Sequence, residues 1–85
     1  MILFIETRTW SWQQLAQILQ ISSNIAQSTS LYVYLSCQNS LREEAERLIQ
    51  FLGFEDNIHV LSAGESPPAF DLKISAPEEM PEWGA

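Results

Sequence analysis

The chain has 85 residues, a formal charge of −7 from eleven acidic and four basic side chains, and a composition that is 46% apolar. This length predicts one domain. Phosphate groups attract Lys and Arg, so the acidic balance excludes nucleic acid and anionic membrane surfaces as favoured partners. No segment has the ~20 apolar residues needed to span a membrane. The single cysteine and the lack of a recognisable signal peptide indicate a cytoplasmic protein.

The first third of the chain predicts a strand followed by a helix. Residues 2–5 form a continuous apolar run, which is typical of a strand covered on both faces. Ser11 and Gln14 have the spacing of a capping box, so we expect a helix over about 12–26. Trp12 falls on its apolar stripe, and Trp10 precedes the cap as a hydrophobic staple.

The middle third repeats this order. Residues 31–35 are aromatic and aliphatic and predict a strand. Ser40 and Glu43 have the spacing of a second capping box, and the apolar residues that follow share one helical face. Gly53 is the expected left-handed residue at the end of this helix.

Two further strands are expected in the last third. They cover residues 58–61 and 70–74, and the second alternates between apolar and polar residues, as a strand with one dry face does. The loop between them contains Gly64 and Pro67-Pro68, which favours an antiparallel hairpin. Residues 77–85 form an acidic tail with Pro and Trp and without periodicity.

These elements predict an α/β fold, a two-layer sandwich with βαβαββ order, in residues 1–76. The sheet is expected to be mixed and four-stranded, with two right-handed crossovers and both helices mainly on one face. Too few helices are available to cover both sides of such a sheet. One face should therefore be open.

Side chains alternate across a strand, so Tyr32 and Tyr34 share a face that is opposite the aliphatic residues between them. We expect this Tyr pair to lie on the open face together with Asp71 and Lys73. A partly aromatic bare face invites a protein partner or a homodimer. Alternatively, the tail folds back and covers it with Trp83 and Met80. The interaction residues we predict are Tyr32, Tyr34, Asp71, Lys73 and Trp83.

Catalytic chemistry has one candidate, Cys37. It follows a strand and precedes a helix start, where a helix dipole can lower a thiol pKa. The single cysteine excludes a Cys-x-x-Cys redox pair, and an inert, half-buried thiol is the alternative. His59 stands alone in a strand and has no metal-ligand spacing around it. We expect no cofactor and no metal.

The βαβαββ order at this length resembles the TusA/SirA family of small sulfur-carrier proteins. The resemblance covers about residues 2–74 and includes a loose match at Glu6 and Arg8. It implies a Cys-Pro-x-Pro motif at the start of the first helix, but Trp12 stands where the reactive cysteine would be and both prolines are missing. No family site is therefore carried over.

Two functional hypotheses remain from the sequence. The first is a non-catalytic interaction or regulatory module that acts through its aromatic sheet face and acidic surface. The second is a thiol-dependent carrier or transferase that uses Cys37. The absence of a catalytic constellation favours the first, a protein that is not an enzyme.

Overall fold

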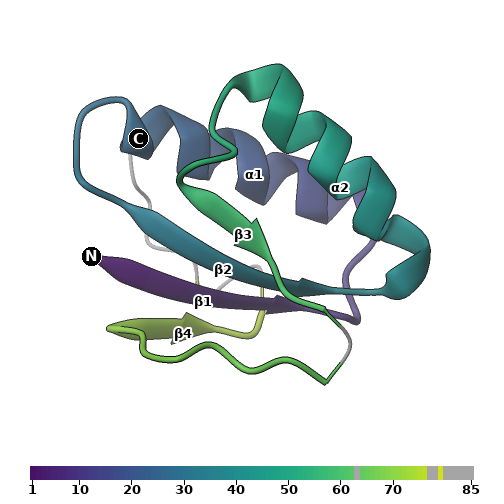
Figure 1. Ribbon diagram of the computed structural model, residues 1–85. Helices are drawn as coiled ribbons and strands as arrows, with labels where there is room; N and C mark the ends of the chain where they lie inside the picture. Colours follow the sequence, from purple (N-terminus) through teal and green to yellow (C-terminus); the bar gives the residue numbers. More distant parts are fainter. Residues whose placement is uncertain (63, 77–78, 80–85) are drawn as a thin grey trace.

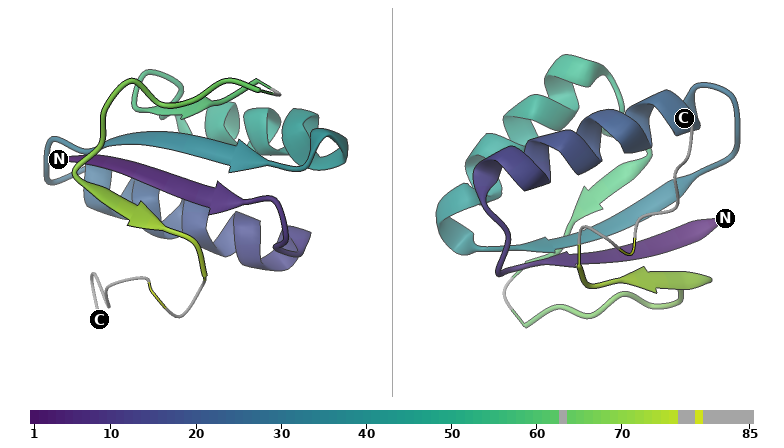
Figure 2. Two further views of the ribbon diagram at one scale, coloured as in Figure 1. Left: turned by 90° about the horizontal axis from the view of Figure 1, so that it is seen from below. Right: turned by 180° about the vertical axis from the view of Figure 1, so that it is seen from behind.

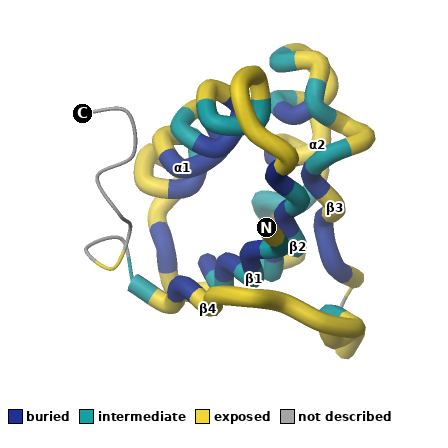
Figure 3. The backbone as a smooth tube through the Cα atoms, turned by 90° about the vertical axis from the view of Figure 1, so that its left-hand side faces the viewer, coloured by how far each residue is buried: buried dark blue, intermediate teal, exposed yellow. Residues whose placement is uncertain are grey.

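The computed structural model describes residues 1–62, 64–76 and 79, which form two helices and four strands (Figure 1). Both helices lie on the same face of a single sheet, so the fold has two layers, one of helices and one of strands (Figures 1 and 3). The elements in chain order are β1 (Ile2–Thr7), α1 (Trp12–Ala26), β2 (Tyr32–Cys37), α2 (Asn39–Leu52), β3 (Ile58–Val60) and β4 (Leu72–Ile74).

The expectation of a mixed sheet is wrong. The strand order is β3-β2-β1-β4, and each of the three strand pairs is parallel. β4 therefore does not form a hairpin with β3. It pairs instead with β1 at the opposite edge of the sheet, with Ile5 beside Ile74.

The route from β3 to β4 follows from the handedness of crossovers. β1, β2 and β3 advance in one direction across the sheet, and right-handed connections place both helices on one face. The return to the β4 edge runs in the opposite direction, so a right-handed connection must pass over the other face. Residues 61–62 and 64–71, which we call the return segment, lie on that face (Figures 2 and 3).

The hydrophobic core lies between the sheet and the two helices. Alternate residues of β1 and β2 point into it, and Leu3, Ile5 and Leu35 are completely buried. α1 and α2 cover these residues with the apolar faces that their sequences predict. The core side chains from the helices are Leu15, Ile18, Leu19, Ala45 and Ile49.

The two helix starts differ. The predicted capping box of α1 is confirmed, because Ser11 Oγ accepts from the Gln14 N–H while the Gln14 side chain accepts from the Ser11 N–H. The predicted box at Ser40 is wrong, since α2 begins at Asn39 with Gln38 as its N-cap. At the other end of α2, Gly53 has φ of 80°, which is the left-handed geometry that its sequence predicts.

Two aromatic side chains lie elsewhere than the pattern predicts. Trp12 does not join the core; it is 37% exposed, whereas Trp10 is buried and donates through Nε1 to the Ser75 carbonyl at 3.2 Å. Phe70 precedes β4 and is exposed. Within β4 itself, Ile74 is the one buried residue of the dry face that the alternation predicts. In the part of the chain that the structure describes, neither helix has the length and apolar character to cross a membrane.

Candidate functional site

The sheet face opposite the helices, here called the open face, carries a row of aromatic side chains. The registers place His59, Tyr34, Phe4 and Lys73 side by side on β3, β2, β1 and β4. We call these four residues the aromatic row. The Tyr34 and His59 rings are 6.0 Å apart and meet edge to face, and Lys73 Nζ lies 5.6 Å from the Phe4 ring centre. The row therefore crosses all four strands.

Tyr32 and Phe70 extend this row. The Tyr32 ring lies 5.0 Å from the Tyr34 ring in a T-shaped contact, and the Phe70 ring lies 5.4 Å from the Phe4 ring. Both tyrosines are half-buried. The open face is thus less bare than the sequence suggests, because the return segment lies over part of it (Figure 2). The same segment places Phe70 against Phe4 on this face. Rings that are half-exposed in this way retain apolar area for a partner.

Asp71 has a structural role at the edge of the open face. Its carboxylate accepts a hydrogen bond from the Ile2 N–H at 2.7 Å, and its own N–H donates to the Ile2 carbonyl at 2.8 Å. These two bonds tie the end of the return segment to the start of β1. Asp71 is therefore engaged within the chain and offers less to a partner than the sequence indicates.

Three charged side chains meet where β1 and β4 end. The Glu6 carboxylate accepts a hydrogen bond from Arg8 Nη2 at 2.9 Å, and Lys73 Nζ lies 3.4 Å from its other oxygen. The hydrogen bond from Arg8 lowers the pKa of the Glu6 carboxyl, and Lys73 acts in the same direction. The Glu6 carboxylate thus contacts two cations, so the three side chains together keep a net positive charge.

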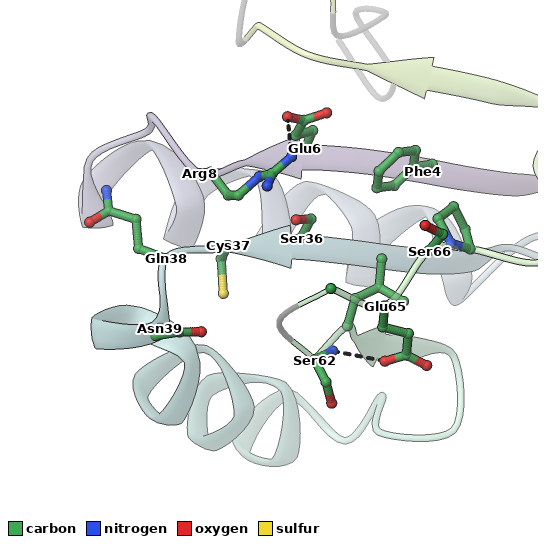
Figure 4. Close-up of a pocket in the computed structure, with 13 residues that line it drawn as sticks. Phe4, Glu6, Arg8, Ser36, Cys37, Gln38, Asn39, Ser62, Glu65 and Ser66 are labelled. Atoms are coloured by element: carbon green, nitrogen blue, oxygen red, sulfur yellow. Dashed lines mark hydrogen bonds and ion pairs between the residues drawn. The ribbon is translucent and has the colours of Figure 1, made fainter.

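A pocket of ≈ 650 Å³ opens beside this group, at the carboxyl ends of the strands (Figure 4). Its walls come from the end of β1, the segment that joins β2 to α2, and residues 61–62 and 64–67 of the return segment. In open α/β sheets, ligands bind outside the carboxyl ends of parallel strands, and pockets of roughly 300–1,000 Å³ hold small molecules. The place and size of this pocket therefore suit a ligand.

The wall formed by the return segment is held by Glu65. Its Oε1 accepts from the Ser62 N–H at 2.8 Å, and its Oε2 lies 3.5 Å from His59 Nε2. The hydrogen bond from Ser62 lowers the pKa of Glu65, and His59 acts in the same direction. The Glu65 carboxylate therefore stays charged at neutral pH, on the side of the pocket away from Arg8 (Figure 4).

Cys37 lies at the end of β2, where it lines the pocket and also packs against the core. Burial raises the pKa of the Cys37 thiol, and the Glu46 charge adds to this rise, although Arg42 opposes it. This direction is opposite to the one that its place before a helix predicts. The physical cause is that the thiol is partly removed from water, which disfavours its charged form.

The structure brings Tyr32, Tyr34 and Lys73 to one face, while Trp83 and Met80 lie outside the described residues. Sequence reasoning missed Phe4, Arg8, His59 and Glu65 as site residues. The signal for Phe4 and His59 is that the registers place both beside Tyr34 on one face of the sheet. The signal for Arg8 and Glu65 is the parallel arrangement, which gathers the carboxyl ends of β1, β2 and β3 around one pocket. In the ranges that the structure describes, no group of three His, Cys, Asp or Glu residues could hold a metal ion.

Comparison with known proteins adds no assignment to this geometry. Trp12, where the resemblance to the sulfur carriers would place a reactive cysteine, is an exposed residue at the first position of α1. The likeness to the TusA/SirA family in the order of elements stays a prediction. No protein-family model, curated protein or solved structure matches the chain.

Proposed function

We propose that this chain is a non-catalytic interaction module that binds a protein partner through its open face. The observation that carries the proposal is the aromatic row, which crosses all four strands on the face opposite α1 and α2. Aromatic side chains are enriched at the centres of protein interfaces because they bury much apolar area at a low entropic cost. The formal charge of −7 favours a basic partner and speeds its approach.

A substitution at the centre of the row tests this proposal. We expect Tyr34→Ala to weaken the complex about tenfold, which corresponds to roughly 1–2 kcal/mol for an interface ring. The measurement is quantitative capture of partners from cell extract on the immobilised protein, together with the mass of the purified protein in solution. Light scattering distinguishes a second copy of the chain from a different partner.

Phe51→Ala is the matched control. Phe51 is an aromatic residue of α2 that is 86% exposed and lies outside the sheet. This variant should capture partners as the unmodified protein does. A strictly monomeric protein that captures nothing would contradict the proposal. Equal losses in both variants would also contradict it, because the contact would then not be specific to the open face.

The second candidate function is a thiol-dependent carrier or transferase that uses Cys37. Its place in the wall of the pocket favours this function, since a substrate there would reach the thiol. The raised pKa of Cys37 opposes it, because the thiolate is the nucleophile. Alkylation of Cys37 faster than that of an unhindered peptide cysteine at neutral pH, with loss of activity in Cys37→Ser, would support it over the interaction module.

A further inference from the structure

The pocket at the carboxyl ends of the strands carries charges of opposite sign on two of its sides. Arg8 extends into it from the end of β1, and Glu65 belongs to the return segment on the other side (Figure 4). Ser36 and Cys37 lie between them at the end of β2. Two members of the aromatic row contact these charges from outside the pocket, because Lys73 lies 3.4 Å from Glu6 and His59 lies 3.5 Å from Glu65. A third member, Phe4, lines the pocket. The pocket therefore borders the proposed protein interface at Phe4, whereas Tyr34, the residue that tests that interface, does not line it.

Glu6 does not cancel all the positive charge beside the pocket, because its one carboxylate is shared by Arg8 and Lys73. Only Nη2 of the guanidinium bonds to Glu6, at 2.9 Å, and that carboxylate also lies 3.4 Å from Lys73 Nζ. A guanidinium has five N–H donors in a flat fork that matches a carboxylate. The side chain of Arg8 is also largely exposed, which leaves donors for a ligand in the pocket.

Glu65 has acceptor capacity left on the other side. One oxygen accepts the Ser62 N–H, and the other has only a long contact of 3.5 Å with His59. A carboxylate offers about four lone-pair sites, so these contacts do not saturate it. A ligand ammonium could bond to this carboxylate without displacing the bond from Ser62.

From these charges we infer that the pocket binds a small zwitterion of the amino acid class. Its carboxylate pairs with Arg8 and its ammonium pairs with Glu65, while Ser36 offers a hydroxyl in the wall between them. A ligand that is only anionic meets Glu6 and Glu65, and one that is only cationic meets Arg8. A ligand with both charges meets a side chain of opposite charge on each of the two sides. The volume of ≈ 650 Å³ accommodates a molecule of this class.

The single thiol provides a direct reporter, because Cys37 lines the pocket. The probe is an equimolar mixture of the common free amino acids without cysteine, and its counterpart is the same mixture as N-acetyl amides, which lack both end charges. The first readout is the rate of Cys37 alkylation by iodoacetamide, relative to the ligand-free rate of the same variant. The second is the set of backbone amide shifts of residues 36–39 and 62–66. We expect the free mixture to slow alkylation and shift these amides, and the capped mixture to do neither.

Three variants test the assigned roles. Arg8→Gln and Glu65→Gln should each weaken binding roughly tenfold or more, since each removes a hydrogen bond to a charged group. Arg47→Gln is the matched control, because Arg47 pairs with Glu43 and Glu44 on α2 and does not line the pocket. It should bind as the unmodified protein does. If Arg8→Gln does not fold, Glu65→Gln decides alone.

The inference is overturned by any of three results. The first is that the free mixture changes neither the alkylation rate nor the amide shifts. The second is that the capped mixture protects Cys37 equally, which would make the end charges irrelevant. The third is that Arg8→Gln and Glu65→Gln bind as tightly as the control. None of these results bears on capture of a protein by the open face, so the two proposals fail separately.

Discussion

The two faces of the sheet are made by alternate residues of the same strands, yet they differ in residue type, burial and charge. The face toward the helices is aliphatic, and Leu3, Ile5 and Leu35 are buried completely on it. The open face carries half-buried rings and ion pairs in the aromatic row and beside it. The first face holds the fold together, whereas the second leaves aromatic area and charges near solvent.

This difference arises from the topology. Two consecutive crossovers in one direction place both helices on one face, and the single crossover in the other direction must use the opposite face. The chain makes that last crossover with the return segment, which contains no described helix or strand. A third helix there would have buried Tyr34 and Phe4. Its replacement by a segment without regular structure is what leaves the open face available.

The largest expected effect is on the free energy of unfolding, and it compares the two faces through neighbouring residues of β2. Leu35→Ala removes a fully buried side chain and should lower the free energy of unfolding by about 2–5 kcal/mol. Tyr34→Ala removes a half-exposed ring with two aromatic contacts and should cost about 1 kcal/mol. Urea unfolding followed by circular dichroism measures both. Equal losses would mean that the open face is part of the core, which would break the comparison.

Phe70→Ala should have a smaller effect, confined to the open face. Its ring contact with Phe4 is worth roughly 0.5–1.5 kcal/mol for an aromatic pair, and exposure of the Phe70 ring favours the lower part of that range. Because the ring helps to hold the return segment, we expect faster hydrogen exchange at the Ile2 and Asp71 amides. The amides of α1 should not change. Uniformly faster exchange would show that the return segment is required for the whole fold.

The sequence predicts the helix-covered face well, because its signals are local. The capping box at Ser11, the periodicity of α1 and the glycine at position 53 each depend on residues within a few positions of one another. The partner of β4 is not a local property. Pro67 and Gly64 indicate a turn, and a turn between strands favours a hairpin.

The length of the connection between β3 and β4 is the signal in the sequence that opposes a hairpin. Residues 61–71 exceed the roughly two to five residues of a hairpin loop. They are enough to cross three strand spacings of about 4.8 Å each and reach the edge of β1. The pocket could not be predicted from local signals either, because it depends on how distant strands pair. Arg8, Cys37 and Glu65 come together only because all the strands end at one edge of the sheet.

The smallest expected effect is a pH dependence of stability, which we expect from Glu6 and not from the buried residues on the helix-covered face. The pKa of Glu6 is lower in the folded chain than its ordinary value of 4.5, because Arg8 and Lys73 stabilise the carboxylate. The folded state therefore binds fewer protons than the unfolded chain as the pH falls. The stability that Glu6 contributes is present above pH 4.5 and is lost as the pH falls through the folded pKa.

Glu6→Gln should therefore cost about 0.2–1 kcal/mol at pH 7, the range for solvent-exposed ion pairs, and this cost should vanish under acidic conditions. Glu65 titrates with the same sign, and its contribution cancels when the two proteins are compared at each pH. The buried polar side chains that the structure describes are Thr7, Ser22 and Ser23, which do not titrate in this range. The cost of Leu35→Ala should accordingly stay constant between neutral and acidic pH while that of Glu6→Gln declines. A cost of Leu35→Ala that fell in parallel would show that the two faces are not energetically separate.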